Sequence, residues 1–300
     1  MRNPLQQVTA RAALVLAFAA LLCSPSPGLA GTIGYLGSAQ SFAVLGYAGV
    51  TNAHSDPNPQ TQIYGNVGVT PAALTYITGF PPGTVTGGTL LGPGPPSPSV
   101  ADQALADIDA AAIALSLLGV TGTYSTNLGG QTVVPGVYDL SSFATTLTGT
   151  VILDAQNSSN ALFVFILPST LTTASNSVVS VINGTPGTQV YWVLGSSAEL
   201  GSGSTFEGNI LAYARIALDP TAKIECGRAF SETASVTLID NNISGNCTAQ
   251  NFGSTQSDFG SLGFSGGTGT GGVPEPGTLS LFAMGLGAGF PLLRKFRPLR

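Results

Sequence analysis

The chain is poor in charged residues, and cations are especially few. Charged residues make up 8% of the 300 residues, against about 25% in an average soluble domain. Between residues 31 and 272 the cations are Arg215, Lys223 and Arg228, against 13 acidic residues. A surface with so few cations cannot neutralise a phosphate backbone, so we expect no binding to nucleic acid.

Histidine is almost absent, which leaves little material for catalysis. The one histidine, His54, lies in a polar loop two residues before Asp56. This is a weak arrangement for a Ser-His-Asp triad, and a surface-loop histidine is the simpler interpretation. A zinc site needs three or four nitrogen or sulfur ligands, and no such cluster is present. We predict no metal site and no cofactor.

Carboxylates are the remaining catalytic candidates, because a pair of them can hydrolyse glycosidic bonds. The candidates are Asp139, Asp154, Glu199, Glu207, Asp219 and Glu225. They are scattered along the chain, and solvated turn positions explain them with less effort. We therefore predict that the protein is not an enzyme, and a carbohydrate-active enzyme is an alternative.

Long apolar runs are missing from the middle of the chain, and the N-terminus differs from it. Residues 1–30 contain two arginines, an 11-residue apolar run and small residues before Gly31. This pattern predicts a secretory signal peptide. Residues 248–272 are rich in Gly, Ser and Thr, which predicts a flexible linker.

Residues 273–300 carry three features in a fixed order. Pro274-Glu275-Pro276 precedes an apolar stretch over 279–293, which is short for a bilayer span, and a basic end. The segment resembles the PEP-CTERM sorting signal of Gram-negative bacteria. The resemblance implies export, transient inner-membrane contact, exosortase-type sorting machinery, and delivery to the cell envelope or extracellular matrix. A single-pass anchor is the alternative.

Residues 31–247 predict one β-rich domain with a single helix. Runs typical of strands cover 41–45, 63–69, 132–139, 151–154, 162–167, 177–181, 190–194 and 236–239. A helix is predicted over 99–118, where Ser99 and Asp102 suit a capping box. Its apolar face is formed by Leu105, Ile108, Ala112 and Leu115.

The last third of this domain contains a loose repeat. Phe206 and Ile224 are 18 residues apart, Leu200 and Ile216 are 16, and Ile216 and Val236 are 20. A period near 18 suits one coil of a β-solenoid, in which stacked coils bury their inward side chains in one column. An antiparallel β-sandwich with Gly-rich turns is the alternative.

Four further motifs follow one another along this domain. They are Ile63-Tyr64-Gly65-Asn66-Val67-Gly68-Val69, Pro135-Gly136-Val137-Tyr138, Gly208-Asn209-Ile210-Leu211-Ala212 and Gly227-Arg228-Ala229. Together they resemble the ice-binding-like family of microbial secreted proteins. The resemblance implies a mainly β protein, a discontinuous three-faced β-solenoid with one long α-helix packed alongside. It also implies binding to ice through one flat face of Thr, Ser and Ala.

Six residues are candidates for this face, because strand alternation points them outward when their neighbours are inward. They are Thr170, Thr172, Ser202, Ser204, Thr221 and Thr237. Glu199 and Ala217 depart from the small hydroxyl residues typical of the family, and Asp219 and Lys223 add charge. We predict ice as the partner, and a polysaccharide surface bound by an adhesin or matrix component is the alternative.

Two cysteines remain once residues 1–30 are removed, Cys226 and Cys247. In an exported protein we predict a disulfide between them. A loop of about 20 residues closed in this way contributes about 3 kcal/mol. A metal pair is the alternative, but no histidine lies near either cysteine.

Overall fold

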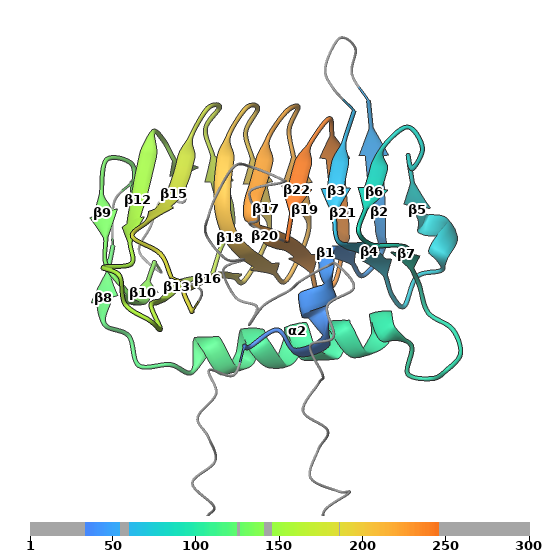
Figure 1. Cartoon of the computed structure of the whole chain (residues 1–300), viewed down its shortest axis with the longest axis horizontal. Helices are drawn as coiled ribbons and strands as arrows, with labels where there is room; N and C mark the ends of the chain where they lie inside the picture. The colour runs from blue at the N-terminus through green and yellow to red at the C-terminus, as the bar shows by residue number, and fades with distance from the viewer. Residues whose placement is uncertain (1–33, 55–59, 125–126, 141–145, 186, 246–300) are drawn as a thin grey trace, which may run out of the picture. The chain divides into compact units, whose positions relative to one another are not determined.

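The computed structural model describes residues 34–54, 60–124, 127–140, 146–185 and 187–245. They belong to one compact unit, Met1–Phe264, whereas a second unit, Ser265–Arg300, lies outside the described residues. The strands wind into a β-solenoid with three faces (Figure 1). Every pairing between described strands is parallel, which confirms the predicted solenoid and makes the antiparallel sandwich wrong.

The first face is a separate seven-stranded sheet, which we call the threonine face because threonine recurs at its outward positions. Its strands are short, so each coil presents few side chains on this face. In stacking order they are β11 (Thr146–Leu147), β14 (Leu171–Thr173), β17 (Ala198–Leu200), β19 (Ile216–Leu218), β21 (Ser235–Ile239), β2 (Gly49–Ala53) and β5 (Ile77–Thr78).

The other two faces share one 15-stranded sheet that bends along its length. The face seen from the front in Figure 1, which we call the charged face, contains β9 (Thr132–Val133), β12 (Thr150–Asp154), β15 (Val178–Ile182), β22 (Asn242–Ser244), β3 (Gln62–Tyr64) and β6 (Thr84–Thr86). The helix face contains β8 (Gly122–Thr123), β10 (Gly136–Asp139), β13 (Leu162–Leu167), β16 (Gln189–Leu194), β1 (Phe42–Gly46), β4 (Asn66–Val69) and β7 (Leu90–Leu91). The long strands β18 (Thr205–Ala212) and β20 (Lys223–Ser231) belong to both faces.

The bend between these two faces requires glycine in β18. The register between β18 and β20 shifts between Glu207 and Asn209. Gly208 has a φ of +112°, and a Cβ there would lie 2.6 Å from a Val190 methyl group. Glycine reaches this region without steric cost, so the sharp corner is encoded locally.

Apolar side chains fill the solenoid interior as continuous columns. Three aromatic residues stack at paired positions of adjacent coils: ring centroids are 5.6 Å apart for Tyr138 and Phe165, and 4.0 Å apart for Phe165 and Trp192. Such rings bury about 150–250 Å² each and dominate a core. The three faces therefore share one hydrophobic core.

Helix α2 (Val100–Ser116) covers the helix face, along the lower side of the stack in Figure 1. The predicted capping box is confirmed, since the Ser99 Oγ accepts from the Asp102 amide and the Asp102 carboxylate accepts from the Ser99 amide. The buried stripe is formed by Ala101, Ala104, Ile108, Ala111 and Leu115. Leu105 and Ala112, predicted on this face with Ile108 and Leu115, are only partly buried.

The helix also connects the two ends of the stack. It follows β7, at one end of the helix face, and precedes β8, at the other end. Its 17 residues extend about 25 Å, which matches about five spacings between strands. The Asp107 carboxylate also accepts from the amide and hydroxyl of Ser38, both at 2.6 Å, in the short helix η1 (Gly37–Ser41).

The order of coils in the stack differs from their order in the sequence. The last coil of the chain pairs with the first: β21 pairs with β2, β22 with β3 and β20 with β1. A short helix η2 (Leu74–Tyr76) precedes β5 at the end of the stack. The predicted discontinuous solenoid is confirmed, and the discontinuity lies inside the stack.

Polar links hold this junction. The guanidinium of Arg228, which is fully buried, donates to the Gln40 carbonyl from Nε at 3.2 Å and from Nη2 at 2.9 Å, and to the Asn209 Oδ1 at 3.0 Å. His54 is exposed and directly follows β2, as expected for a surface-loop histidine, and its Nδ1 lies 2.6 Å from Asp240 Oδ1. Asp56, its neighbour in the sequence, lies outside the described residues.

Candidate functional site

One outward residue per coil forms a straight column down the middle of the threonine face. Strand pairing puts Thr146 beside Thr172, and Thr237 beside Thr51, which in turn lies beside Thr78. Between these two groups the register continues through Glu199 and Ala217. Neighbouring strands of a sheet lie about 4.7–4.9 Å apart, so the column is evenly spaced.

Alternation along each short strand fixes the direction of these side chains. Thr51 is exposed, and its neighbours Val50 and Asn52 are buried. Thr237 is half-buried between Val236 and Leu238, both fully buried. The apolar interior therefore holds each strand in one register and leaves the threonine outside.

The column is interrupted by an ion pair. Glu199 Oε1 lies 2.7 Å from Arg215 Nη2, and both side chains are about half exposed. Ala217, the next residue of the column, is small, and a recess of about 320 Å³ lies beside it. Asp219 also lines this recess. The predicted departures at Glu199, Ala217 and Asp219 thus meet at one place.

Five of the six predicted residues lie at three kinds of position on the threonine face, and the sixth, Ser204, is buried. Thr172 and Thr237 lie in the column. Thr170 immediately precedes β14 and is half-buried. Ser202 and Thr221 lie in the turns that follow β17 and β19, at the edge of the face. Their roles in binding stay predictions.

Ser204 does not point outward as predicted, because it is 1% exposed. The prediction assumed uninterrupted alternation from Leu200 to Phe206. Instead the chain turns between them: the Ser204 amide donates to the Gly201 carbonyl, and Gly203 has a φ of +69°. The turn reverses the side of the sheet to which Ser204 belongs, so its hydroxyl lies inside.

Sequence reasoning missed Thr51, Thr78 and Thr146, which are all exposed members of the column. Thr51 and Thr78 belong to coils near the N-terminus that stack beyond the last coil of the chain, so no sequence period relates them to Thr237. The available signal was local: each follows or precedes a buried Val, Ile or Leu in a short strand-like run.

The charged face presents a different set of outward residues. Glu207 and Glu225 are paired neighbours on β18 and β20, and Lys223 lies on the same strand as Glu225. Burial raises the pKa of Glu207 to about 7, against the opposing hydrogen bond from the Val181 amide, and Glu225 raises it further. Burial likewise raises the pKa of Glu225, and Lys223 lowers it.

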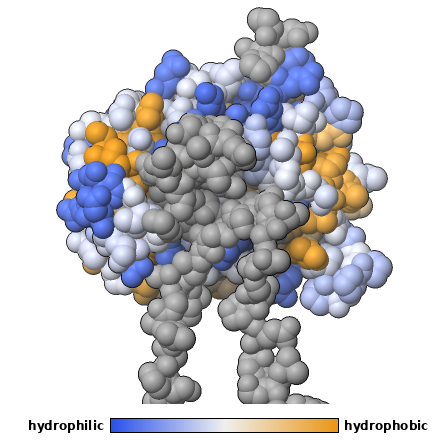
Figure 2. Space-filling view, viewed as in Figure 1, coloured by the Kyte–Doolittle hydropathy of each residue, from blue (hydrophilic) through white to orange (hydrophobic). Residues whose placement is uncertain are grey.

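Where the surface is visible in Figure 2, hydrophobic patches lie near both ends of the stack.

The carboxylates considered for catalysis are otherwise spread over all three faces. Asp139 ends β10 on the helix face, Asp154 ends β12 on the charged face, and Asp219 borders the threonine face. Among the residues that the structure describes, no cluster of three His, Cys, Asp or Glu is suited to hold a metal ion.

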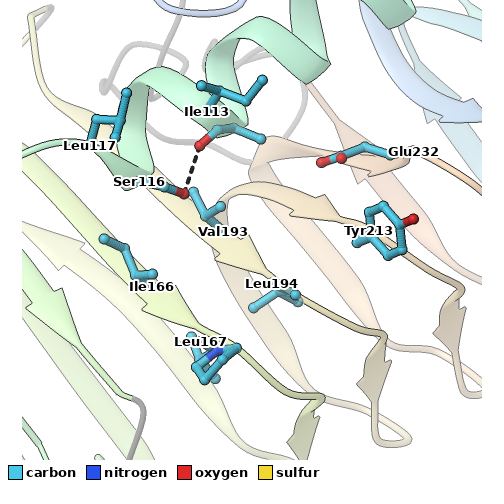
Figure 3. A pocket seen from close by; sticks show the side chains of 12 residues that line it. Ile113, Ser116, Leu117, Ile166, Leu167, Val193, Leu194, Tyr213 and Glu232 are labelled. Atoms are coloured by element: carbon cyan, nitrogen blue, oxygen red, sulfur yellow. Dashed lines mark hydrogen bonds between the residues drawn. The ribbon is translucent and has the colours of Figure 1, made fainter.

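An apolar groove of about 570 Å³ lies between α2 and the helix face, well separated in the fold from the threonine column. Ile113, Leu117 and Tyr213 are exposed at its rim (Figure 3). Glu232 is its only carboxylate among the lining residues, and burial followed by repulsion from Asp109 raises its pKa to about 7. Nothing in its lining resembles the threonine column.

Several predictions fall partly or wholly outside the described residues. Cys226 is buried and disulfide-bonded, but Cys247 lies outside them, so the pairing of these two stays a prediction. Three further predictions concern segments outside the described residues and also stay predictions. These segments are the signal peptide over 1–30, the linker over 248–272 and the sorting motif Pro274-Glu275-Pro276. Within the described ranges, no helix has the length and apolarity needed to span a membrane.

Comparison with known proteins gives a consistent result. The model of the family described as ice-binding-like matches residues 44–244. The chain is 40% identical over 242 residues to an ice-binding protein of Nostoc sp. (strain HG1), covering 80% of this chain and 85% of the relative. It is 31% identical over 192 residues to ice-binding protein K1-A of Typhula ishikariensis, covering 59% of this chain and 76% of that relative.

Solved structures agree with the sequence comparisons. The crystal structure of an ice-binding protein from the Antarctic ascomycete Antarctomyces psychrotrophicus matches with a TM-score of 0.60 and 36% identity, over 70% of this chain and 96% of that one. The corresponding domain of Shewanella frigidimarina ice-binding protein 1 matches with a TM-score of 0.59 and 25% identity, over 70% and 95%.

Proposed function

Because the chain belongs to the ice-binding-like family, we propose that it binds ice, and that it does so through the threonine column. The single observation that supports this site is the register that aligns Thr146 with Thr172, and Thr237 with Thr51 and Thr78. The relatives named above are ice-binding proteins, and the proposal extends that property to this chain.

The physical basis is a rigid array of small amphipathic side chains. Each threonine presents a methyl group and a hydroxyl group, and the parallel strands hold the array at a spacing of about 4.7–4.9 Å. Because threonine has a stiff χ1 torsion, little side-chain entropy is lost when water orders over the column. The threonines carry no charge, so covering them avoids the cost of stripping a charge of its own hydration.

The protein acts without catalysis in this proposal. Of the candidate carboxylates, the pairing of strands makes neighbours of Glu207 and Glu225, and Glu199 and Asp219 line one recess of the threonine face. Asp139 lies apart from these on the helix face. Binding requires neither a cofactor nor a metal ion. The partner is the ice surface itself.

Export is part of the same proposal. Residues 1–30 would direct the chain across the inner membrane, and residues 273–300 would bring it to exosortase-type sorting machinery before release to the envelope or extracellular matrix. The sequence pattern of the two ends supports this address.

A polysaccharide surface is the second candidate partner, bound by the same face of an adhesin or matrix component. The observation that favours it is the polar recess beside Ala217, because Glu199, Arg215 and Asp219 offer charged groups that hydrogen-bond to sugar hydroxyls. Water would not be ordered by these groups in the way that threonines order it.

A matched pair of variants tests the proposed face. Thr51→Tyr places a bulky ring in the column, whereas Thr84→Tyr places the same ring at an exposed position of the charged face. Full chains are compared for recrystallisation of ice in frozen sucrose and for incorporation into a slowly growing ice hemisphere. We expect activity in the unaltered chain and in Thr84→Tyr, and its loss in Thr51→Tyr.

Failure of the unaltered chain to enter ice or to slow recrystallisation would overturn the proposed function. Retention of the chain by an exopolysaccharide column, reduced by Glu199→Gln, would then support the second candidate. Equal activity in both tyrosine variants would place the ice contact on another face.

A further inference from the structure

The Glu199–Arg215 ion pair divides the threonine column into two unequal parts. On one side the uncharged residues of the column are Thr146 and Thr172. On the other side Ala217, Thr237, Thr51 and Thr78 follow one another over four adjacent strands. The two parts share one sheet and one backbone geometry, and they differ in length.

Length matters because ordered water over the column is a collective property. Each additional neutral coil would extend the same row of methyl and hydroxyl groups, and the free energy of an apolar contact grows with its area. A carboxylate and a guanidinium at the boundary each keep their own hydration, which does not follow the spacing of the strands. Within the column, the four neutral side chains on β19, β21, β2 and β5 extend about twice as far as the two on β11 and β14. Asp219 and Arg215 flank Ala217 on β19, so the charged boundary adjoins the first coil of this part.

We propose that the ice contact is made by the part formed by β19, β21, β2 and β5, and that the Glu199–Arg215 ion pair is the boundary that ends it. This inference rests on the proposed function and specifies which portion of the face performs it. Thr146 and Thr172 contribute little, because two coils beyond a charged boundary do not extend the same water lattice.

The location of this contact has a structural consequence. It combines β21, from the end of the described domain, with β2 and β5, from its beginning. The pairing of β21 with β2 runs over five residues of each strand. Arg228 and the His54–Asp240 pair, which link the same two regions, thereby help to align two halves of one binding surface. The ice contact is complete only when the N-terminal coils dock on the last coil.

The two ends of the column provide a matched test. Thr78→Tyr and Thr146→Tyr introduce the same ring at exposed positions at opposite ends of the same sheet. We expect Thr78→Tyr to raise the concentration needed to halve ice recrystallisation by about tenfold or more, and Thr146→Tyr to raise it by less than about twofold. Circular dichroism and thermal unfolding of each full chain verify that both variants fold.

A second pair of variants tests the boundary. Glu199→Thr combined with Arg215→Ser removes the ion pair and joins the two parts into one column of seven coils. We expect the concentration needed to halve recrystallisation to fall by about threefold or more. Lys223→Ser combined with Glu225→Thr is the control, because it removes one cation and one anion from the charged face.

The outcomes separate this inference from the proposed function. If the unaltered chain binds ice but Thr146→Tyr is as damaging as Thr78→Tyr, the inference is wrong and the proposed function stands. An unchanged activity after removal of the ion pair would likewise overturn the boundary. If the unaltered chain is inactive and the variant without the ion pair is active, the boundary is supported and the proposed function fails.

Discussion

The threonine face and the charged face are built on the same coils, yet they differ in the residues that they present to water. Both alternate a buried apolar residue with an outward one, as in Val236-Thr237-Leu238 on β21 and Lys223-Ile224-Glu225 on β20. The inward positions hold the fold, and the outward positions are free to vary. The comparison shows that the solenoid sets the spacing of the outward residues, whereas the residue at each outward position sets the chemistry of the face.

The largest effect is expected where the two faces share their interior. Trp192 is fully buried and stacks on Phe165 at 4.0 Å. We expect Trp192→Ala to lower the free energy of unfolding by about 3–5 kcal/mol, because it opens a cavity under all three faces. Denaturant unfolding measures the loss. Recrystallisation activity should fall with it near the unfolding midpoint.

Trp192→Phe is the control for this change. It keeps an aromatic ring in the column and removes an indole Nε1 that has no hydrogen-bond partner among the described residues. We expect a loss well below that of Trp192→Ala, since no unsatisfied donor remains. An equal loss in both variants would contradict the view that ring volume in the shared column supports the faces.

Much of this interior could be predicted from the sequence, because alternation and the capping signal are local. The helix begins at the residue that its capping box indicates, and the strand-like runs at 162–167 and 190–194 are strands. The period was only approximate. Leu200 pairs with Leu218 at 18 residues, rather than with Ile216 at 16. Bulges and turns change the number of residues per coil without changing the stack.

The threonine face was harder to predict because it depends on contacts that are distant in sequence. Thr237 and Thr51 are neighbours through the pairing of the last coil with the first, which no local pattern indicates. Ser204 was misplaced for the opposite reason: one left-handed glycine in a turn changed the side on which it lies. Alternation holds within a strand, so a face can be predicted only once its turns are known.

An intermediate effect is expected from a change confined to the charged face. The pKa of Glu207 is raised to about 7, mainly because burial disfavours its charged form. In the unfolded chain this carboxyl ionises near its usual pKa of about 4.3. The stability contributed by the protonated carboxyl is therefore fully present below about pH 4 and is lost as the pH rises through about 7, by up to about 3–4 kcal/mol.

Glu207→Gln tests this assignment, because glutamine has similar size and does not titrate. We expect the variant to gain stability relative to the unaltered chain at pH 8 and to gain little at pH 4, as measured by chemical unfolding at both values. Glu232 has a raised pKa on the helix face, so part of the pH dependence should persist. Ice activity, if it belongs to the threonine face, should not change with this substitution.

The smallest effect is expected at the turn that joins the two faces. Thr221 has a φ of +66°, in the left-handed region that β-branched residues rarely adopt, and the neighbouring coil carries Gly203 with a φ of +69° in the corresponding turn. Thr221→Gly relieves backbone strain of about 1–2 kcal/mol in the folded state. Glycine also gives the unfolded chain more conformational entropy, which lowers the free energy of unfolding by about 0.5–1 kcal/mol.

We therefore expect Thr221→Gly to stabilise the protein by less than about 1 kcal/mol, detected as a small rise in Tm. Thr221→Val is the matched comparison, because it keeps the β-branch and removes the hydroxyl. If Thr221 contacts ice, both variants lose recrystallisation activity; if it only shapes the corner, Thr221→Gly keeps it. A loss of stability in Thr221→Gly would mean that the hydroxyl and methyl groups of Thr221 stabilise the turn by more than its backbone strain costs. Side-chain contacts as well as backbone conformation would then hold the edge of the threonine face.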